Sequence, residues 1–533
     1  MANPDMRRLQ LAWAAGSFAL WSSTITLAVY AFDAGGVAAV GLAGLIRLLP
    51  GALASPFGGL LGDRHSRRSV MLGSALAGAL VLAASALAIS LDAPVAVVFA
   101  LAGLFMIASS PYVPAEGALL PAVARTPQEL SAANVAHSFM DNGGFLIGST
   151  ATGVLLAAAS TQAAFAMAAL ASAGAALLVV RMARDERPTY EPEADASGVL
   201  RDTARGARAL FADGRLRLVG AALILLTLFE GAADVLVVVL ALDLLGLGQA
   251  SVGYLNAAWG IGAIAAGAGL AVLLDRGHLA SGLLLGSLTA GASLALPGVW
   301  VVPVAAYIGL IGIGVGYTFT EVAARTLLQR LGDDETLART LGFLETARLA
   351  AMGLGSIAAP ALVALLGGEG ALLALGAVLP LFALLRWSVL RSVEVGAPVD
   401  EGRYRLLSAD SIFAPLPVEA LERLTGDLVP VEIAGGEEII TQGERGERFY
   451  LIESGTVEVF EDGVHRQTER AGESFGEIAL IRDCSRTATV RAKEPTRLMA
   501  LGREQFLAAV TGHRRSGEAA RGVAEQRLGR ELA

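Results

Sequence analysis

Apolar segments long enough to cross a lipid bilayer fill most of this chain, and they restrict its fold more than any other feature. Between residues 11 and 391 they follow one another in runs rich in Ala, Leu, Val and Gly. A helix of about 20 residues spans the ~30 Å hydrocarbon core of a bilayer. Because backbone polar groups inside a membrane must be satisfied within the protein, such runs favour α-helices. The sequence therefore predicts an all-α membrane region that reaches residue 391.

Windows of membrane length predict twelve spans in this region. Their approximate limits are 11–32, 37–62, 70–91, 94–123, 132–158, 162–183, 216–245, 250–274, 279–298, 301–328, 338–366 and 370–391. The first run is too long for the apolar core of a signal peptide, so we expect it to be retained.

Arginine is distributed unevenly over the connections between these spans. The connections 33–36, 92–93, 159–161, 246–249, 299–300 and 367–369 contain no Arg or Lys, whereas the alternate connections carry arginines. The positive-inside rule then places both termini and the C-terminal region in the cytoplasm of a multi-pass cell-membrane protein.

The longest polar connection, residues 184–215, divides the spans six and six. We expect helical lobes at residues 1–183 and 216–391, joined by a cytoplasmic linker in which Arg201 to Arg217 form an amphipathic helix on the membrane surface. The halves also resemble each other, since Glu116-Gly-Ala-Leu-Leu-Pro121 in the first is echoed by Arg325-Thr-Leu-Leu-Gln329 in the second. Two similar halves predict a transporter with its substrate site between the lobes.

The connection after the second span carries the pattern Gly59-Leu-Leu-Gly-Asp63-Arg64-His-Ser-Arg67-Arg68. It resembles the hallmark loop of the major facilitator superfamily, and the corresponding loop of the second half keeps only Asp275-Arg276. The resemblance implies the twelve-helix major facilitator fold with two six-helix lobes, and a secondary transporter that is not an enzyme. The stretches Arg47-Leu-Leu-Pro50 and Pro114 to Pro121 resemble the branch of siderophore and macrolide exporters, which implies efflux of an amphipathic small molecule.

Charged side chains inside a span are costly, so each is a candidate functional residue. Glu230 and Asp234 lie one helical turn apart in the seventh span, and we predict that they carry a coupling proton or cation; the alternative is a structural pairing with an arginine or with hydroxyl groups. Arg47 is a candidate lining residue. Glu321 and Arg325 are spaced for a local ion pair. Charged residues toward the cytoplasmic side are candidates for a gating latch, namely Asp63, Arg64, Arg67, Arg68, Glu116, Asp141, Glu321, Arg325, Glu345 and Arg348.

The sequence has no Walker motif, catalytic triad signature or metal-spaced His/Cys set, which argues against an ATP-driven pump and predicts no catalytic residues, no metal and no cofactor. Its single cysteine, Cys484, excludes an intramolecular disulfide.

After Arg391 the composition becomes polar. We expect a linker at 392–408 and a domain at 409–533, with a helix over Ala409 to Asp427 and a closing helix from Arg503 to Leu532. Alternating apolar and polar residues between glycine turns predict a small β-barrel or jelly roll, with strands at 429–433, 438–441, 449–453, 457–461 and 487–491. Residues 404–512 carry 19 acidic and 12 basic residues, so nucleic acid is not an expected partner.

Two stretches of this domain, Gly443 to Gly455 and Phe475 to Val490, resemble cyclic-nucleotide-binding domains. The resemblance implies that Arg486 binds the cyclic phosphate with Thr487 and backbone groups nearby, and that Glu477 accepts from the ribose 2′-hydroxyl. It implies cAMP as the regulatory ligand, with cGMP possible through Thr487. The implied pocket consists of Phe475, Gly476, Glu477, Ile478, Ala479, Arg486 and Thr487.

Together these features predict a transporter whose cycle is modulated by cAMP, with the lipid bilayer, a small-molecule substrate and the nucleotide as partners. Three alternatives stay open: a membrane-anchored sensor that does not transport, an unregulated exporter with an inert tail, and a lipid scramblase. The sequence leaves the choice between monomer and dimer open.

Overall fold

A computed structural model describes residues 3–123, 127–182, 196–275, 279–331, 334–393, 401–416, 418–512 and 514–531. The chain divides into two compact units, Met1–Glu394 and Val395–Ala533. The first unit is helical and the second combines two antiparallel sheets with short helices. The predicted linkers at 184–215 and 392–408 fall partly outside the described residues.

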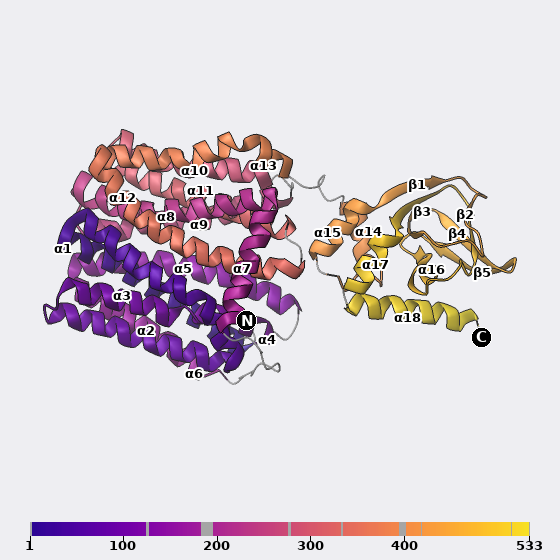
Figure 1. Ribbon diagram of the computed structural model, residues 1–533, viewed down its shortest axis with the longest axis horizontal. Coiled ribbons are helices and arrows are strands. Elements are labelled where there is room, and N and C mark those ends of the chain that lie inside the picture. The colour runs from indigo at the N-terminus through magenta and orange to yellow at the C-terminus, as the bar shows by residue number, and fades with distance from the viewer. Residues whose placement is uncertain are drawn as a thin grey trace. The chain divides into compact units, whose positions relative to one another are not determined.

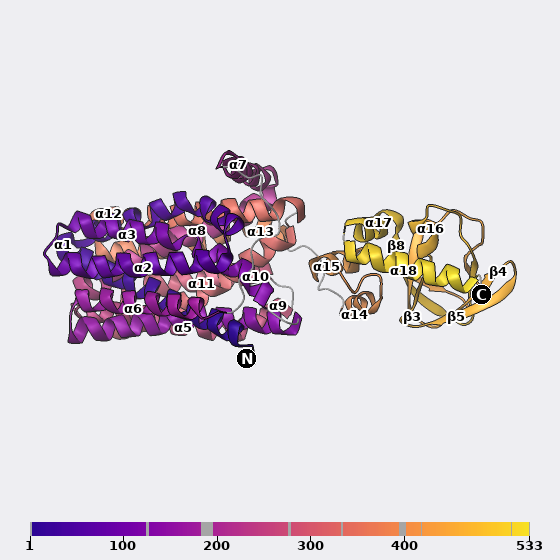
Figure 2. The ribbon, with the colours of Figure 1, turned by 90° about the horizontal axis from the view of Figure 1, so that it is seen from below.

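Most helices of the first unit run side by side along a common direction in both views, whereas α7 (Ala196–Ala212) crosses them in Figure 1 (Figures 1 and 2). Helices of the first half gather on one side, shown in indigo and violet, and those of the second half on the other (Figure 1). Their bounds are α1 (Pro4–Arg64), α2 (Arg67–Ser90), α3 (Val95–Ser109), α4 (Tyr112–Val123), α5 (Pro127–Ala158), α6 (Thr161–Val180), α7 (Ala196–Ala212), α8 (Gly214–Val238), the π-helix η1 (Val239–Leu244), α9 (Ala250–Asp275), α10 (Leu279–Val299), α11 (Pro303–Leu331), α12 (Asp334–Leu385) and α13 (Trp387–Val393).

Two of these helices each contain two predicted spans. Helix α1 breaks at Gly35 and Gly36, where Gly36 has φ +63°, and α12 breaks at Gly367, where φ is +73°. Glycine accommodates this left-handed backbone, so the chain reverses there without a long loop. With α3 and α4 counted as one span and η1 as the end of α8, the described residues reproduce the twelve predicted spans.

Length and composition agree with a membrane location. Eight helices in the described part of the chain are long and apolar enough to cross a membrane, and two of them, Pro4–Ala54 and Arg339–Leu385, have 51 and 47 residues. A stretch of that length, broken at glycine, supplies two crossings of about 20 residues each. The chain is a multi-pass membrane protein.

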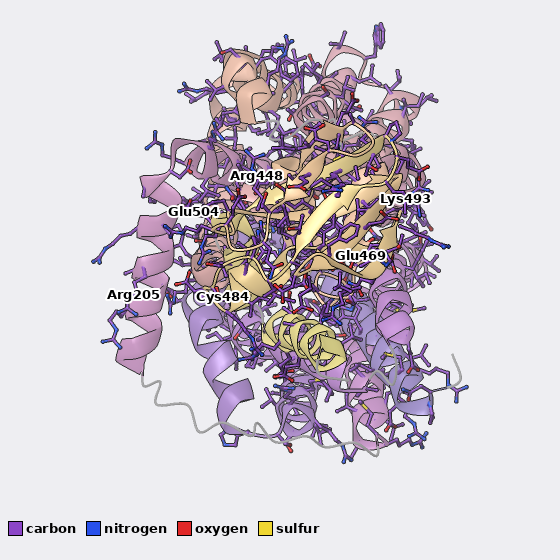
Figure 3. All side chains as sticks on the ribbon, turned by 90° about the vertical axis from the view of Figure 1, so that its right-hand side faces the viewer. Arg205, Arg448, Glu469, Cys484, Lys493 and Glu504 are labelled. Carbon is purple, nitrogen blue, oxygen red and sulfur yellow. The ribbon has the colours of Figure 1, made fainter. Side chains whose placement is uncertain are left out.

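Helix α7 occupies the region in which we predicted a surface helix at 201–217, but it begins and ends earlier. It carries Arg205 (Figure 3) and packs closely on α12: a Cβ atom on Gly206 would lie 2.1 Å from the Arg339 carbonyl oxygen. Helix α7 therefore contacts the second lobe directly.

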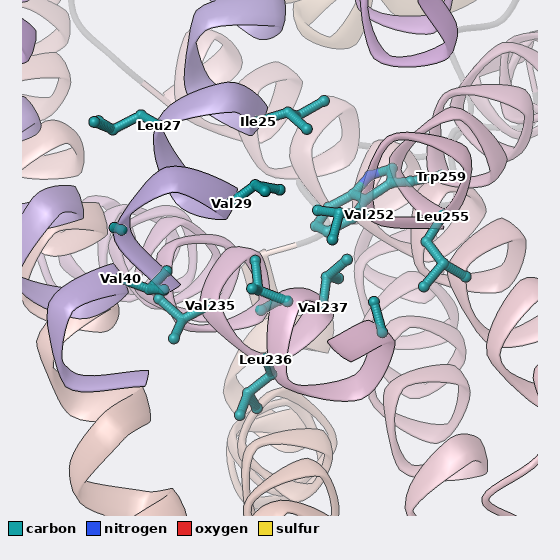
Figure 4. Packing of buried hydrophobic residues seen from close by; sticks show 14 of the residues in the cluster. Ile25, Leu27, Val29, Val40, Val235, Leu236, Val237, Val252, Leu255 and Trp259 are labelled. Carbon is teal, nitrogen blue, oxygen red and sulfur yellow. The ribbon is translucent and has the colours of Figure 1, made fainter. Parts of the chain in front are cut away.

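The two halves pack tightly at the end that carries the arginine-free connections. A Cβ atom on Gly41 of α1 would lie 2.5 Å from Pro360 of α12, and one on Gly253 of α9 would lie 2.6 Å from Gly153 of α5. At the same end, Val40 lies beside Val235 (Figure 4). Small residues allow such close helix approach, so they seal the lobes together at this end.

The second unit contains two four-stranded sheets, ordered β1-β8-β3-β6 and β2-β7-β4-β5, with antiparallel pairing throughout. The described strands are β1 (Val429–Ile433), β2 (Glu438–Ile440), β3 (Arg448–Ser454), β4 (Thr456–Glu461), β5 (Val464–Arg470), β6 (Ser474–Phe475), β7 (Thr489–Ala492) and β8 (Thr496–Gly502). The β-barrel prediction is confirmed, but β5, β6 and β8 were not predicted. Strand β5 is largely polar and β6 has two residues, so neither shows the alternation that identifies a strand.

Helices pack around these sheets, namely α14 (Glu401–Ala409), α15 (Val418–Asp427), α16 (Glu477–Ile481), α17 (Arg503–Gly512) and α18 (Arg514–Glu531). The prediction of one helix over residues 409–427 was wrong, because residues 410–416 form turns. Asp410 accepts from the Ile412 amide at 2.9 Å, and Pro415 removes a backbone donor. Phe413, Phe449 and Phe506 form an aromatic core, with the last two rings stacked at 4.9 Å.

Candidate functional site

A cavity of about 470 Å³ opens in the second unit. It lies within the 300–1,000 Å³ range typical of small-molecule sites. One wall comes from the segment that joins β6, α16 and β7, and the other from β4 and β5. The structure brings all seven residues of the predicted nucleotide pocket to this cavity: Phe475, Gly476, Glu477, Ile478, Ala479, Arg486 and Thr487.

Arg486 is held in place before any ligand arrives. Its side chain is buried, with the residue 7% exposed, and it donates from Nη1 to the Gly476 carbonyl at 2.8 Å and from Nη2 to the Arg448 carbonyl at 2.6 Å. Its backbone N–H donates to the Glu444 carbonyl at 2.8 Å. These bonds use part of the guanidinium's five donors, so an anion in the cavity meets a cation whose orientation is already fixed.

Two glycines make room for this guanidinium. Gly476 has φ +93°, and a Cβ atom there would lie 2.8 Å from Arg486 Nη1. A Cβ atom on Gly446 would lie 2.8 Å from the Ala479 side chain and 3.3 Å from Arg486 Cζ. Any other residue would displace the arginine, so the glycines flanking the pocket have a steric role.

The cavity combines a positively charged group with a hydrogen-bond acceptor, and this pair favours an anionic ligand that carries a polar group beside its anion. Burial lowers the pKa of the Arg486 guanidinium from its ordinary value, while Tyr450 and Glu477 oppose that shift. Arginine stays protonated in proteins, so the group remains a cation. Glu477, the first residue of α16, is 1% exposed and lines the same cavity, so an acceptor and a cation share one wall.

The opposite wall was missed by sequence reasoning. Gln467 and Glu469 of β5 pair in register with Val459 and Val457 of β4, so they face the barrel interior as these valines do. Gln467 Nε2 donates to Glu469 Oε1 at 3.0 Å, and both residues line the cavity. The Asp462-Gly463 turn is a hairpin signal that should have indicated a strand after β4.

The predicted coupling residues lie between the lobes of the first unit. Tyr317 of α11 donates to Glu230 at 2.6 Å, which is a pairing with a hydroxyl group of the kind the structural alternative named. Asp234 lines a cavity of about 30 Å³ with Arg47, Thr24 and others, and Arg47 donates to the Thr24 hydroxyl. Since Arg47 belongs to α1 and Asp234 to α8, the cavity joins both lobes, and it has room for about one water molecule.

The predicted latch residues contact groups within their own lobes. Arg348 bonds Glu321 at 3.0 Å and Glu345 at 3.4 Å, and Arg325 contacts Glu321 at 3.2 Å, which shows the local pair expected from spacing. These contacts link α11 to α12 in the second lobe, so a latch between the lobes stays a prediction.

The latch residues of the first lobe behave in the same way. Arg67 donates to the Ala118 carbonyl at 2.8 Å, and Arg68 donates to carbonyl groups of α6. Glu116 pairs with His137 at 3.2 Å, a partner that was also missed. The side chains of Asp63 and Arg64 lie outside the described residues, as do the Asp275 side chain and Arg276.

The first unit is a bundle of twelve membrane segments in two lobes with charged residues between them, and the second is a barrel with a buried arginine in its cavity. This combination defines a membrane transporter that carries a ligand-binding domain. Comparison with known families agrees. The model of the Major Facilitator Superfamily matches residues 11–356, and that of the cyclic nucleotide-binding domain matches residues 430–513. The chain belongs to the Major Facilitator Superfamily and carries a C-terminal cyclic nucleotide-binding domain.

Similar proteins fall into two groups. A cAMP-dependent protein kinase regulatory subunit of Yarrowia lipolytica is 41% identical over 106 residues, which are 20% of this chain and 28% of that protein. An uncharacterized protein of Mycobacterium tuberculosis is 38% identical over 117 residues, 21% of this chain and 23% of the relative. The chain thus spans less than a third of these relatives. A crystal structure of a POT family transporter covers 73% of this chain and 96% of its own, with a TM-score of 0.60 and 14% identity, which supports the fold of the first unit.

Proposed function

We propose that this chain is a proton-coupled exporter of amphipathic small molecules whose transport is modulated by cAMP binding to its cytoplasmic C-terminal domain. The observation that carries the regulatory part is the fixed, buried guanidinium of Arg486 in a cavity of about 470 Å³. A cyclic phosphate has one negative charge and exposed oxygens, which suit charge-assisted bonds from arginine.

The other cavity groups fit the remaining parts of a nucleotide. Glu477 lies on the same wall as Arg486 and is placed to accept from the ribose 2′-hydroxyl. The family relationship to regulatory subunits named for cAMP dependence favours cAMP, and Thr487 leaves cGMP as the second ligand to test. The pair Gln467 and Glu469 supplies polar groups opposite Arg486, where part of the ligand must lie.

Proton coupling is supported by the acidic pair between the lobes. Glu230 and Asp234 lie one turn apart on α8, with the Arg47 cation from the other lobe close enough to interact with both. A proton that neutralises one carboxylate changes the attraction between the lobes, and a charge change at a lobe interface is what alternating access needs. Export, rather than uptake, is supported by the resemblance around Arg47 and Glu116.

Modulation requires that cAMP bind one conformation of the whole protein more tightly than another. Such couplings are typically 1–3 kcal/mol, so we expect the nucleotide to change the transport rate about 5- to 150-fold and not to act as an absolute gate. The arginine-rich connections support a cytoplasmic location for the barrel, where the nucleotide is available.

The test is transport by the full-length protein in proteoliposomes, with an imposed pH gradient and an amphipathic fluorescent dye as the trial substrate. We expect dye movement that needs the gradient, falls on Glu230→Gln or Asp234→Asn substitution, and changes on addition of cAMP. Transport that ignores cAMP despite measured binding would refute modulation. Binding without any transport by the protein would favour an anchored sensor, and movement of labelled lipid would favour a scramblase.

A further inference from the structure

A second group of ionisable residues lies inside the first lobe, separate from Glu230 and Asp234. Glu116 of α4 is 2% exposed, and its Oε1 lies 3.2 Å from Nδ1 of His137 on α5. Asp141, one turn further along α5, interacts electrostatically with His137. Imidazole can take up and release a proton near neutral pH, so a histidine beside a buried carboxylate is a candidate proton carrier.

Aromatic rings enclose this group. The Trp13 indole lies 4.3 Å from the His137 ring, centroid to centroid, and 6.1 Å from the Tyr112 ring. Trp13 therefore packs against one side of the imidazole, and the His137 side chain stays 28% exposed, which leaves it open to proton exchange.

A cavity of about 100 Å³ adjoins the group, and Trp13, Ser17, Tyr112 and Asp141 are among its lining residues. The Tyr112 residue is only 9% exposed, and none of the described residues bonds to its hydroxyl. A buried hydroxyl that faces a cavity calls for a small polar ligand. The volume holds about three water molecules but is below the 300 Å³ or more of sites for organic ligands.

The group also faces the other lobe. Asp141 interacts electrostatically with Glu321 of α11, and Glu321 accepts from Arg348, which in turn interacts with Glu230. Tyr317 completes the connection by its bond to Glu230.

We propose that Glu116, His137 and Asp141 form a second proton-binding site, which takes a proton from water in the adjoining cavity and exchanges it with the cytoplasmic side. In this site the proton is held on the imidazole, whose Nδ1 faces Glu116 Oε1 at 3.2 Å, and the imidazole gains or loses the exchanging proton. The charged and titratable groups around His137 are Glu116 and Tyr112 on α4, Asp141 on α5 and, beyond Asp141, Glu321 on α11. The inference rests on proton-coupled transport as proposed above, but the site is tested separately.

The first experiment measures the protonation state of His137 by NMR. The chain has five histidines, so full-length protein labelled with ¹⁵N-histidine in nanodiscs gives few ring signals, and His137→Gln identifies the one of interest. We expect that signal to change between neutral and charged forms from pH 9 to pH 5, and Glu116→Gln to alter its titration. The signal of exposed His65 is the internal reference in that variant. A His137 signal in one charge state across this range would overturn the proposal.

The second experiment connects the site to transport. The change of the dye transport rate with pH should be at least tenfold smaller in His137→Gln. The matched His65→Gln variant should keep the wild-type pH profile. A wild-type profile in His137→Gln would also overturn the proposal. If substitution of Glu230 and Asp234 leaves transport unchanged while His137 still titrates, the central coupling pair is refuted and the second site stands.

Discussion

Replacement of Arg486 by lysine separates the two properties that the structure assigns to this residue. The forked guanidinium of Arg486 reaches the Gly476 and Arg448 carbonyls at 2.8 and 2.6 Å and still has further N–H groups for a ligand. Lysine keeps the positive charge but lacks this fork. A single ammonium group cannot make all of these contacts at once. Arg486→Lys should therefore weaken nucleotide binding without removing the charge.

The expected size follows from the bonds lost. One charge-assisted hydrogen bond contributes about 1.5–3 kcal/mol, and each 1.4 kcal/mol is tenfold in affinity. The dissociation constant for cAMP should therefore rise about 10- to 150-fold in isothermal titration of the full-length protein. The carbonyl left without its donor should also destabilise the barrel by about 1–3 kcal/mol. Thermal melting without nucleotide measures that part.

Arg503 provides the matched control, because its head donates to the Gly446 carbonyl at 3.0 Å and pairs with Asp483 but does not line the cavity. Arg503→Lys should change nucleotide affinity by less than about threefold, which corresponds to roughly 0.6 kcal/mol. If Arg486→Lys binds as tightly as the wild type, or if both variants lose affinity equally, the assignment of Arg486 as the phosphate ligand is refuted.

Three further predictions concern other contacts. Gly476→Ala should lower the melting temperature of the barrel and weaken cAMP binding, since the backbone there has φ +93° and the new methyl group would lie 2.8 Å from the guanidinium; equal melting and affinity would contradict this. Tyr317→Phe removes the 2.6 Å bond to Glu230 and should change the pH profile of transport, whereas an identical profile would exclude that bond from coupling. Gly253→Leu should force the lobes apart, because even a Cβ atom would lie 2.6 Å from Gly153. Faster hydrogen exchange in α5 and α9 is expected, and unchanged exchange would refute the close packing of the lobes at this end.

The sequence by itself determined the architecture. Apolar runs of membrane length, arginines in alternate connections and glycine-separated strands are local patterns, and each follows from a few neighbouring residues. The cassette from Phe475 to Thr487 was also identifiable, because its residues lie close together in the chain and meet at one cavity in the fold.

Tertiary structure decided the partners. Tyr317 reaches Glu230 from 87 residues away, and Gln467 and Glu469 face the pocket through the register of β5 on β4. His137 joins Glu116 only because α4 and α5 pack side by side. Helix packing and strand register select these partners, and the Asp462-Gly463 turn was a local signal only for β5. The sequence thus identified the charged residues and the local pair of Glu321 and Arg325, whereas the fold determined the other partners.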